Sequence, residues 1–498
     1  MRKFHLCVSV LLLLCFPLLG QDVHEKDVEE SPSSERVSVS HNSININGQE
    51  MAYTVTTGTY ALKNDMGKEQ ASVFYIAYTR DDARDLGKRP ITFSFNGGPG
   101  SASVWLHLGA LGPRRVLMDS EGGALKPPGK LVDNEASILD HTDLVFIDPV
   151  GTGYSRQAKD VDLAQFTGYE NDYKAVGEFI RLYVSRESRW ESPKFVIGES
   201  YGTVRAAGLV HYLQDRHGMY MNGVMLISAA LDYQTGDVHP GNDLPFVMFL
   251  PTYAATALYH GRVPGTLEDD LVRVLQDAEK FAHGPYHLAL MKGDLLSPTE
   301  FDRIAEQLAG HIGLSTAYVK RHNLRVPLEY FCQELLRDKQ RTVGRLDTRL
   351  LGIMADPSSP TLGSDPSFAA ILGSYSTTIN SYLREELGYD HNAPYRVMAG
   401  LRTWKWESGD YINVSLPLRQ AMNQNPHLKV FVGNGYFDLA TPYFATEYTF
   451  NHMGLEKAQQ RNVTMAYYPA GHMMYIHHPS LAKFKADLVA FINSACLP

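Results

Sequence analysis

Cysteine is scarce in this chain. Only four cysteines occur in 498 residues, and two of them lie in the apolar segment at the N-terminus. The other two, Cys332 and Cys496, could form one disulfide in an oxidising compartment or remain two separate thiols. A fold held together by many disulfides is therefore excluded. No pair of cysteines has the spacing of a zinc site, and we expect no bound metal.

An excess of basic residues is also lacking. The chain has 46 Lys and Arg against 55 Asp and Glu, which gives a net charge of −9 at pH 7. No basic stripe is visible, so nucleic acid is excluded as a partner. Hydrophobic residues make up 44% of the chain and charged residues 20%, as in an ordinary globular protein. The length allows one large domain with an insertion, or two domains.

Long apolar runs are missing beyond the N-terminal segment. None reaches the about 18 residues that a membrane-spanning helix needs, so we expect no membrane span. Residues 6–19 are apolar, follow the basic Arg2 and Lys3, and are interrupted by Pro17. This pattern predicts a signal peptide over residues 1–20 and a secreted or periplasmic protein. Residues 21–35 are acidic and rich in serine, which predicts a flexible lead-in.

Short apolar runs alternate with helical patterns along much of the chain. The runs at 144–147 and 195–197 are continuously apolar, as buried parallel strands are, and the segment between them, 171–185, has a helical pattern. Strands alternating with helices predict an α/β fold with a doubly wound, mostly parallel sheet. The other predicted strands cover residues 36–39, 51–57, 71–78, 91–95, 223–227 and 429–432.

Residues 233–395 have a different pattern, rich in helical segments such as 267–282, 298–308 and 328–339. We interpret this region as a mainly helical cap. It would be inserted between two parts of an α/β core, residues 36–232 and 396–498. An insertion of this kind commonly lies over the active site. Tyr253 and Trp404 are candidate pocket contacts, although either type of residue is more often part of a core.

The pentapeptide Gly-Glu-Ser-Tyr-Gly at residues 198–202 is the most informative motif. It follows the apolar run 194–197 and precedes a helical segment that begins at Thr203. A strand that enters a helix through Gly-x-Ser-x-Gly is the nucleophile elbow of the α/β-hydrolase fold. The turn is too tight for side chains at its flanks, and it exposes the serine hydroxyl at a helix N-terminus. Ser200 is therefore the predicted nucleophile.

A serine nucleophile needs a base and an acid that orients the base. In this fold the order along the chain is serine, then acid, then histidine. Asp438 follows the predicted strand 429–432 and a glycine-rich turn, and His472 follows Gly471 in a loop after a β-like run. The neighbouring pair His477 and His478 are rivals for the base, which we interpret as surface or structural residues.

The segment Phe-Asn-Gly-Gly-Pro-Gly-Ser at residues 95–101 follows an early strand, where this fold places a loop that donates an oxyanion N–H group. We expect the backbone N–H groups of Gly98 and Tyr201 to form the oxyanion hole, although a plain tight turn is the alternative. The stretch 150–153 superficially suggests a dinucleotide loop. Its third glycine is missing and Pro149 precedes it, so we expect no cofactor.

Four segments together resemble the signature set of the serine carboxypeptidase family (peptidase family S10). They are residues 96–101, 148–155, 198–202 and 471–473, in that order, and they span nearly the whole predicted mature chain. The resemblance implies an α/β-hydrolase core with a helical insertion. It also implies peptide substrates with a free C-terminus, removal of the C-terminal residue and a preference for acidic pH.

The resemblance also implies a role for each matching residue. It makes Ser200 the nucleophile, His472 the base and Asp438 the orienting acid, and it gives Gly98 and Tyr201 to the oxyanion hole. It makes Asn96 and Glu199 the residues that bind the substrate's terminal carboxylate. This last role agrees with elementary electrostatics, because a carboxylate is repelled by an ionised glutamate but can share a proton with a neutral one.

The chain departs from the family in three respects. Ala110 stands before Leu-Gly-Pro where members often carry a glutamate, which affects the expected acid preference. The segment around Asp438 differs from the common form, and cysteines are few for a eukaryotic member. These features resemble a bacterial secreted branch of the family.

Two other functions are compatible with parts of the pattern. An esterase or acyltransferase could use the same triad, but it would need no carboxylate clamp of the kind that Asn96 and Glu199 suggest. A non-catalytic binding protein could share the scaffold, but it would not need an intact set of serine, aspartate and histidine.

Overall fold

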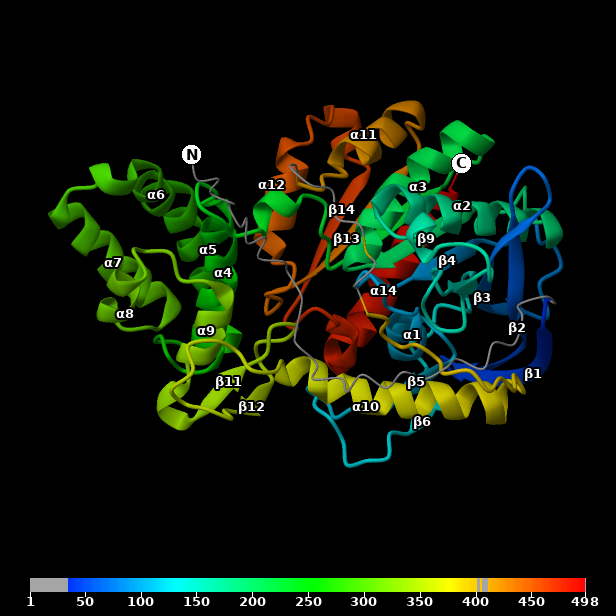
Figure 1. Cartoon of the computed structure of the whole chain (residues 1–498), viewed down its shortest axis with the longest axis horizontal. Coiled ribbons are helices and arrows are strands. Elements are labelled where there is room, and N and C mark those ends of the chain that lie inside the picture. Colours follow the sequence, from blue (N-terminus) through cyan, green and yellow to red (C-terminus); the bar gives the residue numbers. More distant parts are fainter. Residues whose placement is uncertain (1–34, 401–403, 405–410, 498) are drawn as a thin grey trace, which may run out of the picture.

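A computed structural model describes residues 35–400, 404 and 411–497. The predicted signal peptide and almost all of the predicted lead-in lie outside these residues. The main feature of the described part is a ten-stranded sheet, with helices on both faces and a group of helices at one end (Figure 1).

Most of the sheet is parallel. Its strands lie in the order β1-β2-β3-β7-β4-β9-β10-β13-β14, and β8 pairs with β3. Strands β7, β4, β9, β10, β13 and β14 are parallel, whereas β1, β2, β3 and β8 form an antiparallel part at one edge. The predicted α/β class with a doubly wound, mostly parallel sheet is confirmed. The strands are β1 (Val37–Ile46), β2 (Gln49–Lys63), β3 (Glu69–Arg80), β4 (Ile91–Phe95), β7 (Asp143–Ile147), β8 (Arg156–Gln157), β9 (Lys194–Glu199), β10 (Gly223–Ile227), β13 (Lys429–Gly435) and β14 (Val463–Tyr468).

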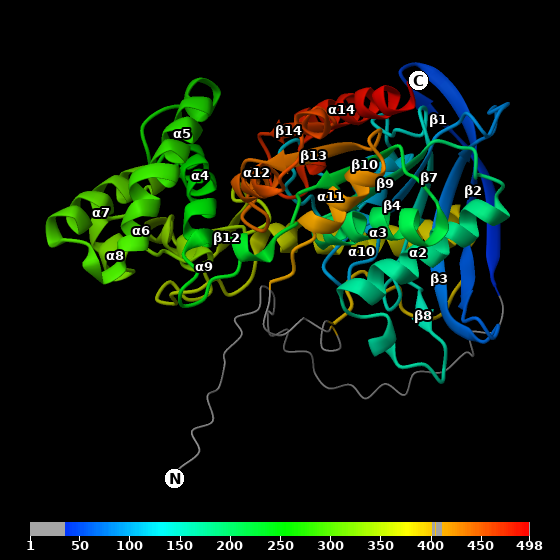
Figure 2. The same cartoon turned by 90° about the horizontal axis from the view of Figure 1, so that it is seen from above.

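The central strands are buried on both faces, as their continuous apolar sequences predict. In β9, Phe195 and Ile197 belong to one hydrophobic cluster, and Val196 belongs to another on the opposite face. The first cluster includes residues of α1, α10 and α14, and the second includes residues of α2, α3 and α11. Figure 2 shows α14 and α3 on opposite sides of the strands. These helices are α1 (Val104–Leu106), α2 (Tyr169–Arg186), α3 (Tyr201–His217), α10 (Pro366–Ser381), α11 (Ser415–Gln424) and α14 (His478–Cys496).

A third hydrophobic cluster holds the helices between β10 and α10, at the left of Figure 1. It also includes Phe437 and Tyr443, so these helices pack against the chain that follows β13. Their bounds are α4 (Leu244–Tyr259), α5 (Leu267–Phe281), α6 (His287–Lys292), α7 (Pro298–Ile312), α8 (Thr316–Arg321) and α9 (Leu328–Glu334). No helix in the described part of the chain is both long and apolar enough to cross a bilayer.

The remaining elements are short. A π-turn, η1 (His107–Leu111), follows α1, and the segment 328–339 that the sequence suggested as one helix is α9 followed by a separate 3₁₀ turn, η6 (Arg337–Lys339). Further short elements are β5 (Arg114–Val116), β6 (Leu131–Asp133), β11 (Arg341–Val343), β12 (Leu351–Ile353), α12 (Tyr443–His452), α13 (Lys457–Gln460) and the 3₁₀ turn η9 (Met474–Ile476).

The two cysteines of the described residues are free thiols. Cys332 is buried in α9, and Cys496 is exposed at the end of α14. Of the two alternatives left by the sequence, the structure therefore has the unpaired one.

Candidate active site

Ser200 lies at the sharp turn between β9 and α3. Its backbone has φ 60° and ψ −130°, a conformation that a residue with a side chain seldom adopts. A Cβ atom added to Gly198 would lie 2.2 Å from the carbonyl oxygen of Gly202, and one added to Gly202 would lie 3.0 Å from that of Phe95. The flanking glycines are therefore required by packing, and the turn has the form of a nucleophile elbow.

His472 and Asp438 form a buried pair. The Nδ1 atom of His472 is 2.7 Å from Oδ2 of Asp438. The same carboxylate accepts hydrogen bonds from the Thr441 hydroxyl and from the backbone N–H groups of Ala440 and Thr441. These donors satisfy both carboxylate oxygens and hold Asp438 in one orientation, so that the imidazole is held as well.

Two opposing effects act on the pKa of His472. Burial lowers the pKa, but the adjacent Asp438 raises it by more, and the pKa lies above its ordinary value. An imidazole in this environment can accept a proton readily while its Nδ1 atom stays bonded to the carboxylate.

The end of β10 connects Ser200 and His472. The backbone N–H of Ser200 donates to the carbonyl of Ile227, 2.9 Å away. The hydroxyl of the next residue, Ser228, donates to the carbonyl of His472 at 2.7 Å. Asp438 follows the adjacent strand β13, and His472 follows β14. The structure thus brings Ser200, Asp438 and His472 to the carboxyl ends of neighbouring parallel strands.

The glycine-rich loop after β4 lies against the start of α3. A Cβ atom on Gly97 would come within 2.4 Å of the backbone nitrogen of Tyr201 and within 2.6 Å of that of Gly202. Gly98 has φ +103°, which favours glycine. The loop with Gly98 and the amide of Tyr201 are therefore adjacent, as an oxyanion hole requires.

Asn96 and Glu199 are bonded to each other in a buried position. The Asn96 side chain accepts a hydrogen bond from the backbone of Leu106 through Oδ1, at 3.0 Å, which fixes the direction of its amide. Its Nδ2 atom donates to Oε1 of Glu199 at 3.0 Å. Burial raises the pKa of Glu199 to about 7, although the nearby His472 and the hydrogen bonds oppose this shift. Glu199 therefore gains a proton far more easily than an exposed glutamate.

The loop that carries Asn96 is supported from α3. Nη1 of Arg205 donates to the Asn96 carbonyl at 2.6 Å. The rest of the Arg205 guanidinium pairs with Asp172 of α2, at 2.8 Å, and both side chains are buried. This ion pair connects the two helices to the position of Asn96.

Tyr475 is a site residue that sequence reasoning missed. It lies three positions after His472, in η9, and its hydroxyl donates to Oε2 of Glu199 at 2.5 Å. The two residues are 276 positions apart in the chain. No sequence motif marks this contact, because it depends on where folding places the Tyr475 ring relative to Glu199.

The other residues that the sequence singled out have different surroundings. Tyr253 is buried in the third cluster, where its ring stacks on Phe331 at 3.9 Å between centroids. Trp404 contacts the ring of Tyr201, edge to face, at 5.2 Å. His477 is buried, and its Nδ1 atom is 2.7 Å from the Ser480 hydroxyl, which agrees with a structural role.

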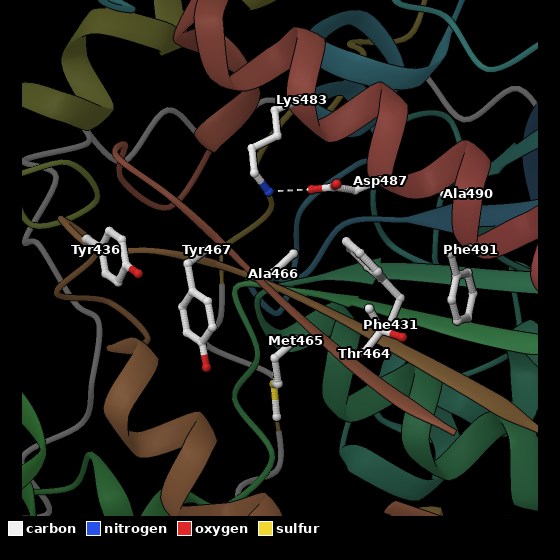
Figure 3. Close-up of a pocket in the computed structure, with 10 residues that line it drawn as sticks. All are labelled: Phe431, Tyr436, Thr464, Met465, Ala466, Tyr467, Lys483, Asp487, Ala490 and Phe491. Atoms are coloured by element: carbon white, nitrogen blue, oxygen red, sulfur yellow. Dashed lines mark hydrogen bonds and ion pairs between the residues drawn. The ribbon is translucent and has the colours of Figure 1, made fainter. Parts of the chain in front are cut away.

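A groove between β14 and α14 contains none of the predicted site residues (Figure 3). An ion pair between Lys483 and Asp487 lies in it. Within the described ranges, no group of three or more His, Cys, Asp or Glu side chains could hold a metal ion. The groove is lined by Phe431, Tyr436, Thr464, Met465, Ala466, Tyr467, Lys483, Asp487, Ala490 and Phe491.

The fold and the elbow define the class of protein. A solved structure of a prohormone-processing carboxypeptidase from Saccharomyces cerevisiae matches 89% of this chain and 91% of its own, with a TM-score of 0.53 and 16% identity. At this identity the likeness shows the fold alone. The protein therefore has the α/β-hydrolase fold that the sequence predicted.

Sequence comparison relates part of the chain to one protein family. The model of the family described as serine carboxypeptidase matches residues 50–239. The pheromone-processing carboxypeptidase KEX1 of Saccharomyces cerevisiae is 32% identical over 155 residues, or 29% of this chain and 20% of the yeast protein. Serine carboxypeptidase 1 of Hordeum vulgare is 28% identical over 143 residues, or 28% of this chain and 27% of the barley protein. The chain thus spans about a quarter or less of the length of these relatives, and its similarity to the serine carboxypeptidase family lies in residues 50–239.

Proposed function

We propose that this protein is a secreted serine carboxypeptidase that removes C-terminal residues from peptides through an acyl-enzyme. The observation that carries the proposal is the buried pair of Asn96 and Glu199 directly beside Ser200. A hydrolase that only cleaved esters would not need a buried, proton-sharing carboxyl group at its nucleophile. The match of residues 50–239 to the serine carboxypeptidase family model supports the same activity.

The proposed chemistry begins with His472, which removes the proton of the Ser200 hydroxyl. The Oγ atom then attacks the carbonyl of the last peptide bond, and the N–H groups of Gly98 and Tyr201 stabilise the oxyanion. His472 gives its proton to the leaving amino group, and water hydrolyses the acyl-enzyme in a second, equivalent step. Asp438 keeps the imidazole in the required tautomer through its bond to Nδ1.

Asn96 and Glu199 would recognise the substrate's terminal carboxylate. An amide NH₂ group has two protons, and one of those of Asn96 goes to Glu199. We assign the second to a carboxylate oxygen of the substrate. The other carboxylate oxygen would accept the proton of a neutral Glu199, which removes the repulsion between two anions.

These roles set opposing demands on pH. Binding needs neutral Glu199, whose raised pKa of about 7 keeps it protonated at acidic and near-neutral pH. Catalysis needs neutral His472, whose pKa is raised above its ordinary value by Asp438 after burial has lowered it. The free-acid substrate should therefore bind best at acidic pH, while the turnover of bound substrate increases as pH rises.

The predicted signal peptide and cap belong to the same proposal. We infer that residues 1–20 direct the chain to a secreted or periplasmic location, which N-terminal sequencing of the mature protein would test. We also infer that the cap of residues 233–395 limits access to Ser200. The third hydrophobic cluster packs its helices against the chain between β13 and α12, which carries Asp438.

The test is hydrolysis of an N-blocked dipeptide and of its C-terminal amide from pH 3 to 8, with Ser200→Ala as the inactive control. We expect release of the C-terminal residue from the free acid only, with KM rising as pH increases. Glu199→Gln should remove the pH dependence of KM. Equal turnover of acid and amide, or cleavage of simple esters alone, would instead identify an esterase or acyltransferase with the same triad.

A further inference from the structure

The hydroxyl of Tyr475 donates a hydrogen bond to the carboxyl oxygen of Glu199 that Asn96 does not contact. Asn96 donates to Oε1 at 3.0 Å, and Tyr475 donates to Oε2 at 2.5 Å. Both donors are buried. The two oxygens of one carboxyl group are therefore held by partners from different elements, the loop after β4 and the η9 turn.

Packing fixes the position of the Tyr475 ring. A Cβ atom added to Gly109 would lie 2.4 Å from Cε2 of Tyr475 and 2.6 Å from the hydroxyl oxygen of Tyr375. Glycine at position 109 therefore lets both rings approach the same place. The Tyr375 hydroxyl is buried and has no hydrogen-bond partner among the described residues. Of the two tyrosines, only Tyr475 is bonded to Glu199.

We propose that Tyr475 is a positioning residue that determines which oxygen of Glu199 presents a proton to the substrate's carboxylate. This inference rests on the proposed carboxypeptidase function. Both oxygens of Glu199 accept a hydrogen bond, but the bond from the Tyr475 hydroxyl to Oε2 (2.5 Å) is shorter than that from Asn96 to Oε1 (3.0 Å), which makes Oε2 the carbonyl oxygen of the neutral acid. The proton is then carried by Oε1, on the side of Asn96, where the second N–H of the amide also points to the substrate.

The same bond affects the ionisation of Glu199. A donor stabilises an ionised carboxylate more than a neutral carboxyl group, so Tyr475 opposes the increase in pKa that burial causes. The other groups that act on Glu199 are His472 and Asn96, which also lower its pKa, and Asp438, which raises it; the Glu199 charge also acts on Tyr375 of α10. None of them donates to Oε2, so the loss of the Tyr475 hydroxyl is uncompensated.

The test is Tyr475→Phe, which removes one oxygen atom and keeps the ring. KM for the free-acid dipeptide at pH 5 should rise about threefold to tenfold. The pH at which KM begins to increase should move upward by about one unit. Turnover of a simple ester, which needs no clamp, should stay within about twofold. Tyr375→Phe is the matched control, because it removes the neighbouring unbonded hydroxyl. KM and the pH at which KM begins to increase should both stay as in the wild type.

Two further variants separate the possible failures. In a Glu199→Gln background, Tyr475→Phe should no longer change the pH dependence of KM. Gly109→Ala keeps the hydroxyl but displaces the ring, and it should raise KM in the same direction; it serves as the test if Tyr475→Phe does not fold. A pH dependence of KM that is lost in Glu199→Gln but is unchanged in Tyr475→Phe would overturn this inference alone. A wild type with no preference for the free acid would overturn the proposed function as well.

Discussion

At the scale of single residues, the site depends on groups that are held in one orientation. Asp438 is the clearest case, because its two oxygens accept from His472, from the Thr441 hydroxyl and from two backbone N–H groups. A carboxylate with so many donors cannot rotate without losing several bonds. Its negative charge is therefore always directed at Nδ1 of His472.

Asp438→Asn tests this role. The amide would donate to Nδ1 of His472 and leave the imidazole proton on the nitrogen that must accept the serine proton. We expect kcat to fall by about 10³- to 10⁴-fold, with KM little changed, because the tautomer is wrong while the binding groups are intact. Steady-state kinetics on the blocked dipeptide would measure this. Thr441→Val removes one hydroxyl donor and should cost far less; a fall of under tenfold for Asp438→Asn would contradict the assignment.

Much of this site could be predicted from the sequence because local motifs mark it. The glycines around Ser200 and the order of serine, aspartate and histidine are visible in the chain. Tyr475 could not be predicted in this way. Its bond joins positions 276 apart, and it depends on glycine at position 109 leaving room for the ring. Contacts of this kind come from packing in three dimensions and leave no spacing to recognise.

At the scale of elements, the parallel strands were the easiest part to predict. They are short and rich in apolar residues because both faces are covered by helices. The hairpin of β1 and β2 is longer than the sequence suggested, although the Asn47-Gly48 turn between them, with positive φ at both residues, is a recognised hairpin signal. The α4 helix lies in the region predicted to be mainly helical but was not singled out, because it is apolar around its whole circumference and contains Pro251, so it has no amphipathic pattern.

The ion pair between α2 and α3 gives a prediction at this scale. Arg205→Met would leave the Asp172 carboxylate buried without its partner and remove the donor to the Asn96 carbonyl. We expect the free energy of unfolding to fall by about 3–5 kcal/mol, measured by denaturant unfolding. KM for the free-acid substrate should rise in the same variant.

A double variant provides the control for that prediction. Arg205→Met with Asp172→Leu replaces the pair by apolar side chains, which should restore most of the lost stability. KM should stay high, because the Asn96 carbonyl still lacks its donor. A single variant that loses less than about 1 kcal/mol would show that the pair is not structurally important.

At the scale of the whole molecule, three hydrophobic clusters together support the elements that carry the site. Two of them hold the sheet from its opposite faces, and the third joins the helices of residues 244–334 to the chain after β13. Glu199 and Asp148 are acidic groups that are buried within this framework. Burial raises the pKa of Glu199 to about 7 and that of Asp148 to about 6.

These buried acids make the stability of the fold depend on pH. Between pH 4.5, the ordinary value for Glu199, and about 7, the folded chain keeps a proton that the unfolded chain has lost. Unfolding releases that proton, so the free energy of unfolding falls as pH rises through this window. Asp148 acts in the same direction between its ordinary value of 3.8 and about 6. The loss in free energy of unfolding is complete at pH values above both ranges and is absent at low pH.

Glu199→Gln should remove the larger of these two pH-dependent losses in stability. We expect the variant to match the wild type at pH 4 and to exceed it by about 1–3 kcal/mol at pH 8, measured by denaturant unfolding at pH 4, 6 and 8. Glu191→Gln, at an exposed position, is the matched control and should show no such trend. A stability difference that stays constant with pH would mean that Glu199 is not held neutral by the fold. The gain in stability should accompany the loss of the pH dependence of KM for the free acid, because the same buried carboxyl group would destabilise the fold and recognise the substrate.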